Sequence, residues 1–337
     1  MTTQHSARQN PQPAEPDLVI LHHGQHYIVR QVICDSTSDV IVSFEYWKPQ
    51  PTLEGEFAGE SFFRGRGLNA IGVMAARNDW YQHDEIEQVI AAIRAATPSQ
   101  RRIGYGGSMG GYAVINFADL LGLSWLVAVI PQFSIDPAKV PFETRWRHEA
   151  AAIEFRHDRI ESVPRLTQGW IVYDPWCSDD NQHARLIQRY HVLSECHPHF
   201  GGHHQFLMLQ QADMFSQMLL DMFAGHFDYP AFIRAFRSAR RNSASFWLGL
   251  GGNLAWRNRI AAAREALARA RALPHPEPQG FDDLQAAILA AETHYAQALM
   301  PPPLSEYIEK AIISPVPPLP RPLWRRVAGR LRRMLLG

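Results

Sequence analysis

A serine enclosed by glycines is the residue of this sequence best suited to nucleophilic chemistry. Ser108 stands in Gly-Gly-Ser-Met-Gly, residues 106–110, which matches the G-x-S-x-G nucleophile elbow. A serine held on a tight turn between a strand and a helix needs strained backbone angles and neighbours without colliding side chains. A helix beginning at Met109 would direct its free N–H groups at the same place, so Met109 is the candidate donor of one oxyanion hydrogen bond.

Two phosphate-binding patterns compete for the same glycines, and neither is complete. A P-loop requires Lys followed by Ser or Thr after the glycines, and this pair is missing here. The dinucleotide pattern G-x-G-x-x-G begins at Gly104 but has Met109 in its sixth place. A plain glycine-rich turn is the structural alternative to a reactive serine.

Strands and helices alternate around this turn. Ser108, Asp174 and His203 each follow a predicted strand, and the ligands of open parallel sheets bind at the carboxyl ends of the strands. The alternation predicts an α/β fold, with a mostly parallel sheet covered by helices on both faces. Strands are predicted on both sides of a hairpin turn at 23–25, and then at 40–47, 69–75, 102–105, 125–130, 169–174 and 192–196. Helices are predicted at 84–96, 112–121, 149–155, 180–190 and 211–223.

The serine motif with its strand and helix resembles the α/β-hydrolase superfamily, over about residues 38–224. The resemblance implies a serine-histidine-acid site in which the residues follow the order Ser, acid, His along the chain. It also implies that the histidine lies in the loop after the last strand, often next to a glycine.

The Gly-His pair at residues 202–203 fits that place, so His203 is the candidate base that takes the proton of Ser108 and returns it to the leaving group. His204 is the alternative, because the segment 197–204 holds four histidines. Regularly spaced acidic or cysteine partners for a metal are missing there. The sequence therefore predicts neither a metal nor a cofactor.

The acid is expected in the loop directly after the 169–174 strand, which allows Asp174 or Asp179. Asp174 closes the strand and is the preferred candidate, although it is also suited to a turn before proline. Asp179 begins the next helix, where a carboxylate more often caps the helix than acts in catalysis.

The second oxyanion donor is expected near Tyr46 or Trp47, after the 40–47 strand. The His-Gly pair common there in the superfamily is missing, so the second donor is not identified. The segment 78–82 (NDWYQ) also follows a strand. Its side chains either line a substrate pocket or cap and pack a helix.

The composition limits the kinds of binding partner and the cellular compartment that we expect. Lys and Arg total 33, as do Asp and Glu, in 337 residues. No global attraction to nucleic acid is therefore expected. The three cysteines are an odd number without metal-like spacing, which fits a reducing compartment. The sequence contains no apolar run long enough to span a bilayer. Cytoplasmic localisation is expected.

The chain divides into four predicted segments: a disordered leader (1–16), the α/β-hydrolase domain (17–225), a helical region (226–314) and a Pro-rich linker with a basic tail (315–337). The helical region includes predicted helices at 230–241, 254–273 and 281–299, the middle one resembling a tetratricopeptide-type hairpin helix. The tail at 321–337 mixes arginines with apolar residues at near-helical spacing. It is a candidate for peripheral contact with the inner membrane surface, or a solvated tail.

The preferred function is a serine hydrolase that acts on a small-molecule, lipid or glycan substrate with an ester, thioester or related acyl bond. Acyl transfer to a sugar or lipid acceptor is the alternative within the enzyme class. A non-catalytic binding or scaffold protein of the same fold is the alternative outside it.

Overall fold

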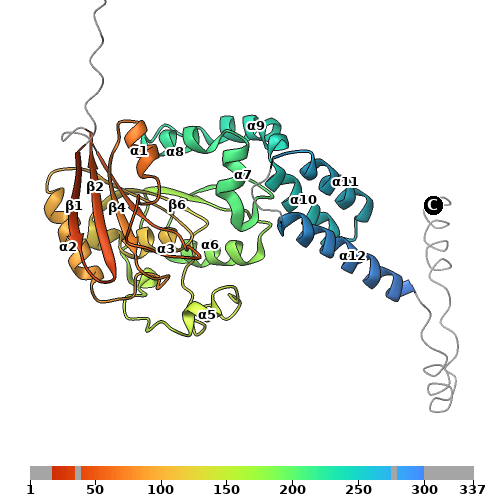
Figure 1. Ribbon diagram of the computed structural model, residues 1–337, viewed down its shortest axis with the longest axis horizontal. Helices are drawn as coiled ribbons and strands as arrows, with labels where there is room; N and C mark the ends of the chain where they lie inside the picture. The colour runs from red at the N-terminus through yellow and green to blue at the C-terminus, as the bar shows by residue number, and fades with distance from the viewer. Residues whose placement is uncertain (1–16, 35–38, 275–278, 300–337) are drawn as a thin grey trace, which may run out of the picture. The chain divides into compact units, whose positions relative to one another are not determined.

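An eight-stranded sheet carries the predicted serine turn (Figure 1). The computed structural model describes residues 17–34, 39–274 and 279–299. The predicted leader (1–16) and the linker and tail (315–337) lie outside these residues. The strands are β1 (Asp17–His23), β2 (Tyr27–Ile33), β3 (Val40–Phe44), β4 (Asn69–Ala75), β5 (Arg102–Gly107), β6 (Leu123–Val129), β7 (Gly169–Val172) and β8 (Ser194–Cys196).

The strand order is β1-β2-β4-β3-β5-β6-β7-β8. β2 runs antiparallel to β1 and β4, and every later pairing is parallel. Gly106 of β5 is paired with Phe44 of β3 and with Ala128 of β6, so these strands end at the same edge. The loops after β3, β5, β6, β7 and β8 therefore meet there, as the sequence predicts for a parallel sheet.

Helices cover both faces of the sheet, so the central strands β3 and β4 are buried along their whole length. In Figure 1, α1 and α8 lie on one face, and α2, α3 and α6 lie on the other. The helices of this part are α1 (Glu60–Gly65), α2 (Ile86–Ala96), α3 (Met109–Asn116), α4 (Ala118–Leu121), α5 (Arg147–Ala150), α6 (Ser178–Tyr190), α7 (Gln205–Gln211) and α8 (Phe215–Phe223). Short 3-10 turns lie at η1 (Ile160–Ser162) and η2 (Gly202–His204).

The rest of the described chain is helical: α9 (Tyr229–Ala239), η3 (Arg240–Asn242), α10 (Ala244–Trp256), α11 (Ile260–Arg271) and α12 (Gln279–Leu299). Phe232, Phe236 and Phe246 from α9 and α10 are buried in the same apolar core as the sheet. The described residues up to Leu289 form one compact unit, and the described residues 290–299 fall outside it. Within the described residues, no helix combines the length and apolarity needed to cross a bilayer.

Three helix predictions were wrong in detail. The predicted 254–273 helix is two helices, because Asn258 between α10 and α11 has φ of 57°. Asp213, with φ of 54°, likewise separates α7 from α8 where one helix was predicted at 211–223. Asn and Asp tolerate this left-handed conformation, which ends a helix. The predicted 149–155 helix is reduced to α5 (Arg147–Ala150).

Candidate active site

Ser108 lies between β5 and α3 with φ of 50° and ψ of −118°, outside the favoured regions for a residue with a side chain. Its backbone N–H donates to the carbonyl oxygen of Val129 on β6 at 2.9 Å, which holds the turn against the sheet. Ser108 is 6% exposed, so access to its hydroxyl is narrow. The strained serine turn predicted from the sequence is present.

Two glycines make this turn possible. A Cβ on Gly106 would lie 2.3 Å from the backbone of Gly110, at the start of α3. A Cβ on Gly110 would lie 2.2 Å from the carbonyl oxygen of Phe44, at the end of β3. Strand β5, helix α3 and strand β3 therefore approach one another at backbone contact distance, and only glycine fits.

His203 is hydrogen bonded to the serine. Its Nε2 lies 3.0 Å from the Oγ of Ser108, and its Nδ1 lies 2.9 Å and 3.1 Å from the two carboxylate oxygens of Asp180. A carboxylate only accepts hydrogen bonds, so Nδ1 carries the proton and Nε2 has a free lone pair facing the serine. His204, the alternative base, is exposed to solvent.

Asp180 therefore occupies the position of the acid, and the predictions of Asp174 and Asp179 need correction. The carboxylate of Asp174 accepts the backbone N–H groups of Trp176 and Gly202 at 3.0 Å each, so it holds the loop that carries His203. Asp179 lies next to Asp180 in the first turn of α6 but is about one-third exposed, with Arg145 at 3.7 Å.

Burial of Asp180 acts to raise its pKa, but hydrogen bonds from His203 and the charge of Arg145 outweigh burial and hold the pKa below its ordinary value. Burial instead dominates at Asp174 and raises the pKa of that carboxyl, despite its backbone hydrogen bonds. Asp180 is thus the carboxylate whose ionised form the protein stabilises.

An arginine and a second carboxylate extend the site behind Asp180. Arg145 donates from Nη1 to Asp180 at 2.8 Å and from Nη2 to Glu143 at 2.6 Å. Glu143 is buried, which acts to raise its pKa, but its bonds to His183 and Arg145 lower the pKa to about 2. Glu143 is therefore ionised and balances the charge of Arg145.

His183 connects the Arg145–Glu143 pair to the segment after β6 that contacts the serine. Its Nε2 lies 2.9 Å from Glu143, and its Nδ1 accepts the backbone N–H of Phe133 at 3.1 Å. Since Nδ1 accepts, the imidazole is neutral with its proton on Nε2, and burial lowers its pKa accordingly.

The neighbouring residue, Gln132, is fully buried and closes a ring at the serine that consists of hydrogen bonds and one covalent link, the peptide bond between Gln132 and Phe133. Its Nε2 donates to the Oγ of Ser108 at 2.9 Å, while its Oε1 has no partner among the described residues. Oγ can accept this bond while it donates its own proton to His203. The order Ser108, His203, Asp180, Arg145, Glu143, His183, Phe133, Gln132 thus returns to Ser108.

The expected oxyanion donors lie at the same edge of the sheet. Met109 is the first residue of α3, where backbone N–H groups have no partner within the helix. The chain leaving β3 toward Tyr46 and Trp47 passes against Gly110, as the contact of that glycine with Phe44 requires. The role of Met109 and the identity of the second donor stay predictions.

Aromatic side chains connect His203 with the lining of a neighbouring pocket. The ring of Trp146 lies 5.9 Å from the imidazole of His203 and 5.7 Å from the ring of Trp47. Trp47 also lines a pocket of about 630 Å³. Most of its lining residues are polar, among them Asn78, Asp79, Gln82, His148, Glu149 and Arg156.

The residues of the segment 78–82 have two different kinds of surroundings. The side chains of Asn78, Asp79 and Gln82 line this pocket, whereas Trp80 and Tyr81 are buried in the core. Both aromatic residues have positive φ, 49° and 59°, which turns them inward.

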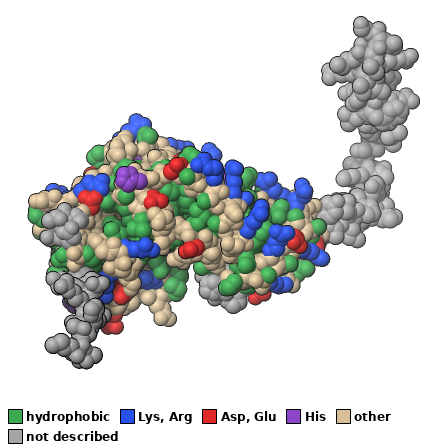
Figure 2. Space-filling view, turned by 90° about the horizontal axis from the view of Figure 1, so that it is seen from above, with side chains coloured by type: hydrophobic (Ala, Val, Ile, Leu, Met, Phe, Trp, Pro, Cys, Tyr) green, Lys and Arg blue, Asp and Glu red, His purple; other side chains and the backbone are tan. Residues whose placement is uncertain are grey.

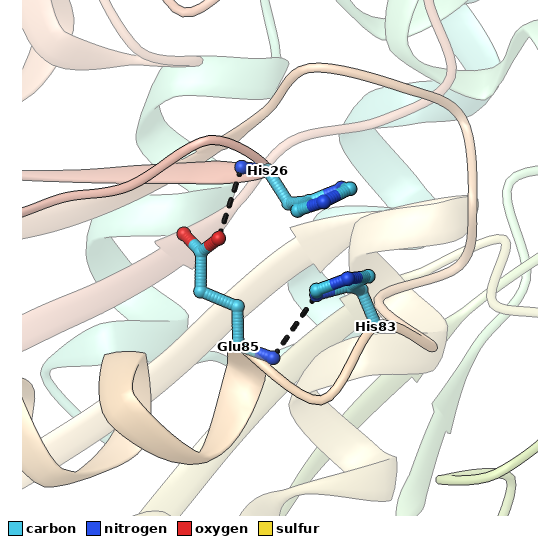
Figure 3. Close-up of side chains that lie close together, drawn as sticks. All are labelled: His26, His83 and Glu85. Atoms are coloured by element: carbon cyan, nitrogen blue, oxygen red, sulfur yellow. Dashed lines mark hydrogen bonds between the residues drawn. The ribbon is translucent and has the colours of Figure 1, made fainter.

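At the edge of this pocket, His26 and His83 stack with ring centroids 3.4 Å apart, and Glu85 lies beside them (Figure 3). In the described part of the chain, this is the group of histidine and acidic side chains close enough to share an ion. The in-plane lone pairs of parallel rings do not converge on one point. The Nδ1 of His83 accepts the N–H of Glu85, and the carboxylate accepts the N–H groups of His26 and Tyr27. These hydrogen bonds hold the β1–β2 hairpin against the start of α2.

No protein-family model matches the sequence, and no curated protein does. Solved structures resemble it at low identity. Est1E from Butyrivibrio proteoclasticus is 10% identical and covers 61% of this chain and 99% of its own, with a TM-score of 0.42. The fluorophosphonate-binding serine hydrolase FphF of Staphylococcus aureus is 13% identical, with coverages of 66% and 99% and a TM-score of 0.40. The capsule O-acetyltransferase of Neisseria meningitidis serogroup A is 12% identical, with coverages of 52% and 84% and a TM-score of 0.39.

These similarities are too weak to carry an activity. The assignment of the fold rests on features of the chain itself. These are a mostly parallel eight-stranded sheet, helices on both faces and a strained serine turn after β5. The chain has the α/β-hydrolase fold.

Proposed function

We propose that the protein is a serine hydrolase that cleaves an ester, thioester or related acyl bond through an acyl-enzyme on Ser108. One observation supports this above all others: the Oγ of Ser108 lies 3.0 Å from the Nε2 of His203, whose Nδ1 is bonded to Asp180. A scaffold protein that had lost catalysis would have no need to keep this alignment together with a strained serine backbone.

The geometry supports the following steps. His203 accepts the proton of Ser108 as Oγ attacks the acyl carbon, and Asp180 stabilises the imidazolium that forms. The N–H of Met109 donates to the oxyanion of the tetrahedral intermediate. The imidazolium then protonates the leaving group, and the acyl group stays on Oγ. Water then attacks the acyl carbon while His203 takes its proton, and the imidazolium returns this proton to Oγ as the bond to the acyl group breaks and the acid leaves.

A fluorophosphonate probe tests the proposal, because Oγ displaces fluoride from phosphorus only when the base activates it. We expect labelling of the native protein that is abolished in Ser108→Ala and in His203→Ala. His204→Ala is the matched control and should label normally. Failure of the folded native protein to label would refute the proposal.

Acyl transfer is the second candidate function, and the polar pocket that Trp47 lines favours it. Carboxylate, amide, imidazole and guanidinium groups beside an indole suit a hydroxyl-rich leaving group or acceptor. Product analysis with an activated ester, with and without added sugar alcohols, separates the two reactions. Acylated alcohol in excess of free acid would indicate transfer, and free acid alone would indicate hydrolysis.

A further inference from the structure

The helices that follow the sheet carry an excess of positive charge. Residues 229–273, which span α9 to α11, contain nine arginines and one acidic residue, Glu265, although the whole chain has equal numbers of basic and acidic residues. Eight of these arginines are exposed, and we call them the arginine surface: Arg234, Arg237, Arg241, Arg257, Arg259, Arg264, Arg269 and Arg271.

Much of this charge is not neutralised within the protein. Arg234, Arg237, Arg241 and Arg259 form no ion pair with any residue that the structure describes. Arg269 pairs with Glu265 at 2.8 Å. Figure 2 shows Lys and Arg side chains gathered over these helices on the face in view. Such a surface attracts anions.

Apolar groups accompany the arginines. Trp256, at the end of α10, is 83% exposed, with Arg257 next to it in the chain and Arg259 two residues further on. Within the same unit, α11 and α12 enclose a groove of about 270 Å³ whose lining includes Leu267 and Ile288 together with arginines. The arginines of this lining are Arg264 and Arg271.

We propose that the arginine surface and Trp256 bind the surface of an anionic phospholipid membrane. Arginines contact lipid phosphates and carboxylates in the headgroup layer, where an exposed indole is also favoured. A nucleic-acid surface would use the arginines equally well, but it gives no role to an apolar groove beside guanidinium groups. This proposal does not depend on the chemistry at Ser108.

The test measures binding of the full chain to vesicles of phosphatidylcholine with and without about 30% phosphatidylserine. The native protein should bind the anionic vesicles and not the neutral ones. Arg237→Ser/Arg259→Ser removes two exposed arginines without ion pairs. At about fivefold for each arginine, affinity should fall about 25-fold. Trp256→Ser should weaken binding without changing its dependence on salt.

The matched control is Arg185→Ser/Arg189→Ser, which makes the same charge change at two exposed positions of α6 and should leave affinity nearly unchanged. Equal losses in the two double variants would overturn the proposal. So would absence of binding to the anionic vesicles. A loss confined to Arg325→Ser/Arg326→Ser would assign binding to the tail and overturn it too. Tighter binding to duplex DNA than to vesicles, lost in Arg237→Ser/Arg259→Ser, would identify a nucleic-acid surface instead.

Discussion

Replacing Arg145 should change the pH at which the serine becomes reactive. Arg145 and His203 both bond to the same oxygen of Asp180, at 2.8 Å and 2.9 Å, so their nitrogens are at most 5.7 Å apart. Two positive charges at that distance repel by about 3 kcal/mol at an effective dielectric constant of about 20, or about 2 pKa units. Both side chains are partly exposed, which reduces the effect. Arg145→Met should therefore move the pH dependence of Ser108 labelling to higher pH by about one pH unit.

The assay is the rate of fluorophosphonate labelling as a function of pH, which reports the base in the free enzyme. The acidic limb of the profile should move to higher pH in Arg145→Met. It should move to lower pH in Glu143→Gln, because the arginine charge then loses its counter-ion. Arg145→Lys, which keeps the charge, is the matched control and should stay near the native profile.

A double variant, Arg145→Met/Glu143→Gln, removes one charge of each sign and should return the limb toward its native position. If the two single substitutions acted only by disturbing the packing, they would lower the labelling rate, and they would not move the acidic limb of the profile in opposite directions. Shifts of the same sign in both single variants, or no shift in either, would refute the electrostatic reasoning.

Three further outcomes are expected. Asp180→Asn should lower the labelling rate roughly 10³–10⁴-fold, whereas Asp174→Asn should lower thermal stability more than it lowers the rate. Gln132→Leu should slow labelling of Ser108 about tenfold, since one hydrogen bond to Oγ is lost, with thermal stability unchanged; a native rate would contradict the role given to this amide. The Glu143 carboxylate has its pKa lowered from 4.5 to about 2, so its stabilisation is complete above pH 4.5 and is lost toward pH 2. Glu143→Gln should cost about 3 kcal/mol of unfolding free energy at pH 7 and little at pH 2, as measured by denaturant titration.

The fold was accessible from the sequence because its signals are local. Apolar runs predict the buried strands, and the glycines around Ser108 predict a turn that no larger residue fits. The breaks at Asp213 and Asn258 were not predicted, because either residue type is also found inside helices. Only the left-handed backbone at these positions separates the helices.

The acid was missed because it was sought in the loop after β7, whereas Asp180 lies in the first turn of α6. The helical pattern itself carried a signal. Asp180, Ala184 and Ile187 are buried on one face of α6, whereas Asp179 points about 100° away. A carboxylate on the apolar face of a helix requires a buried partner, which favours Asp180 over Asp179. The contribution of Arg145 has no such local signal, since its partners are 2 and 35 positions away.

The ring through Gln132 and Asp180 has a consequence for where charge lies during the reaction. At rest it contains two ionised carboxylates and one guanidinium, so one negative charge is unmatched. In the proposed reaction, the imidazole of His203 gains a positive charge when it accepts the serine proton. The charges of the protein groups then balance, and an equal negative charge moves to the oxyanion of the substrate, so the total charge of the site is unchanged while its location shifts.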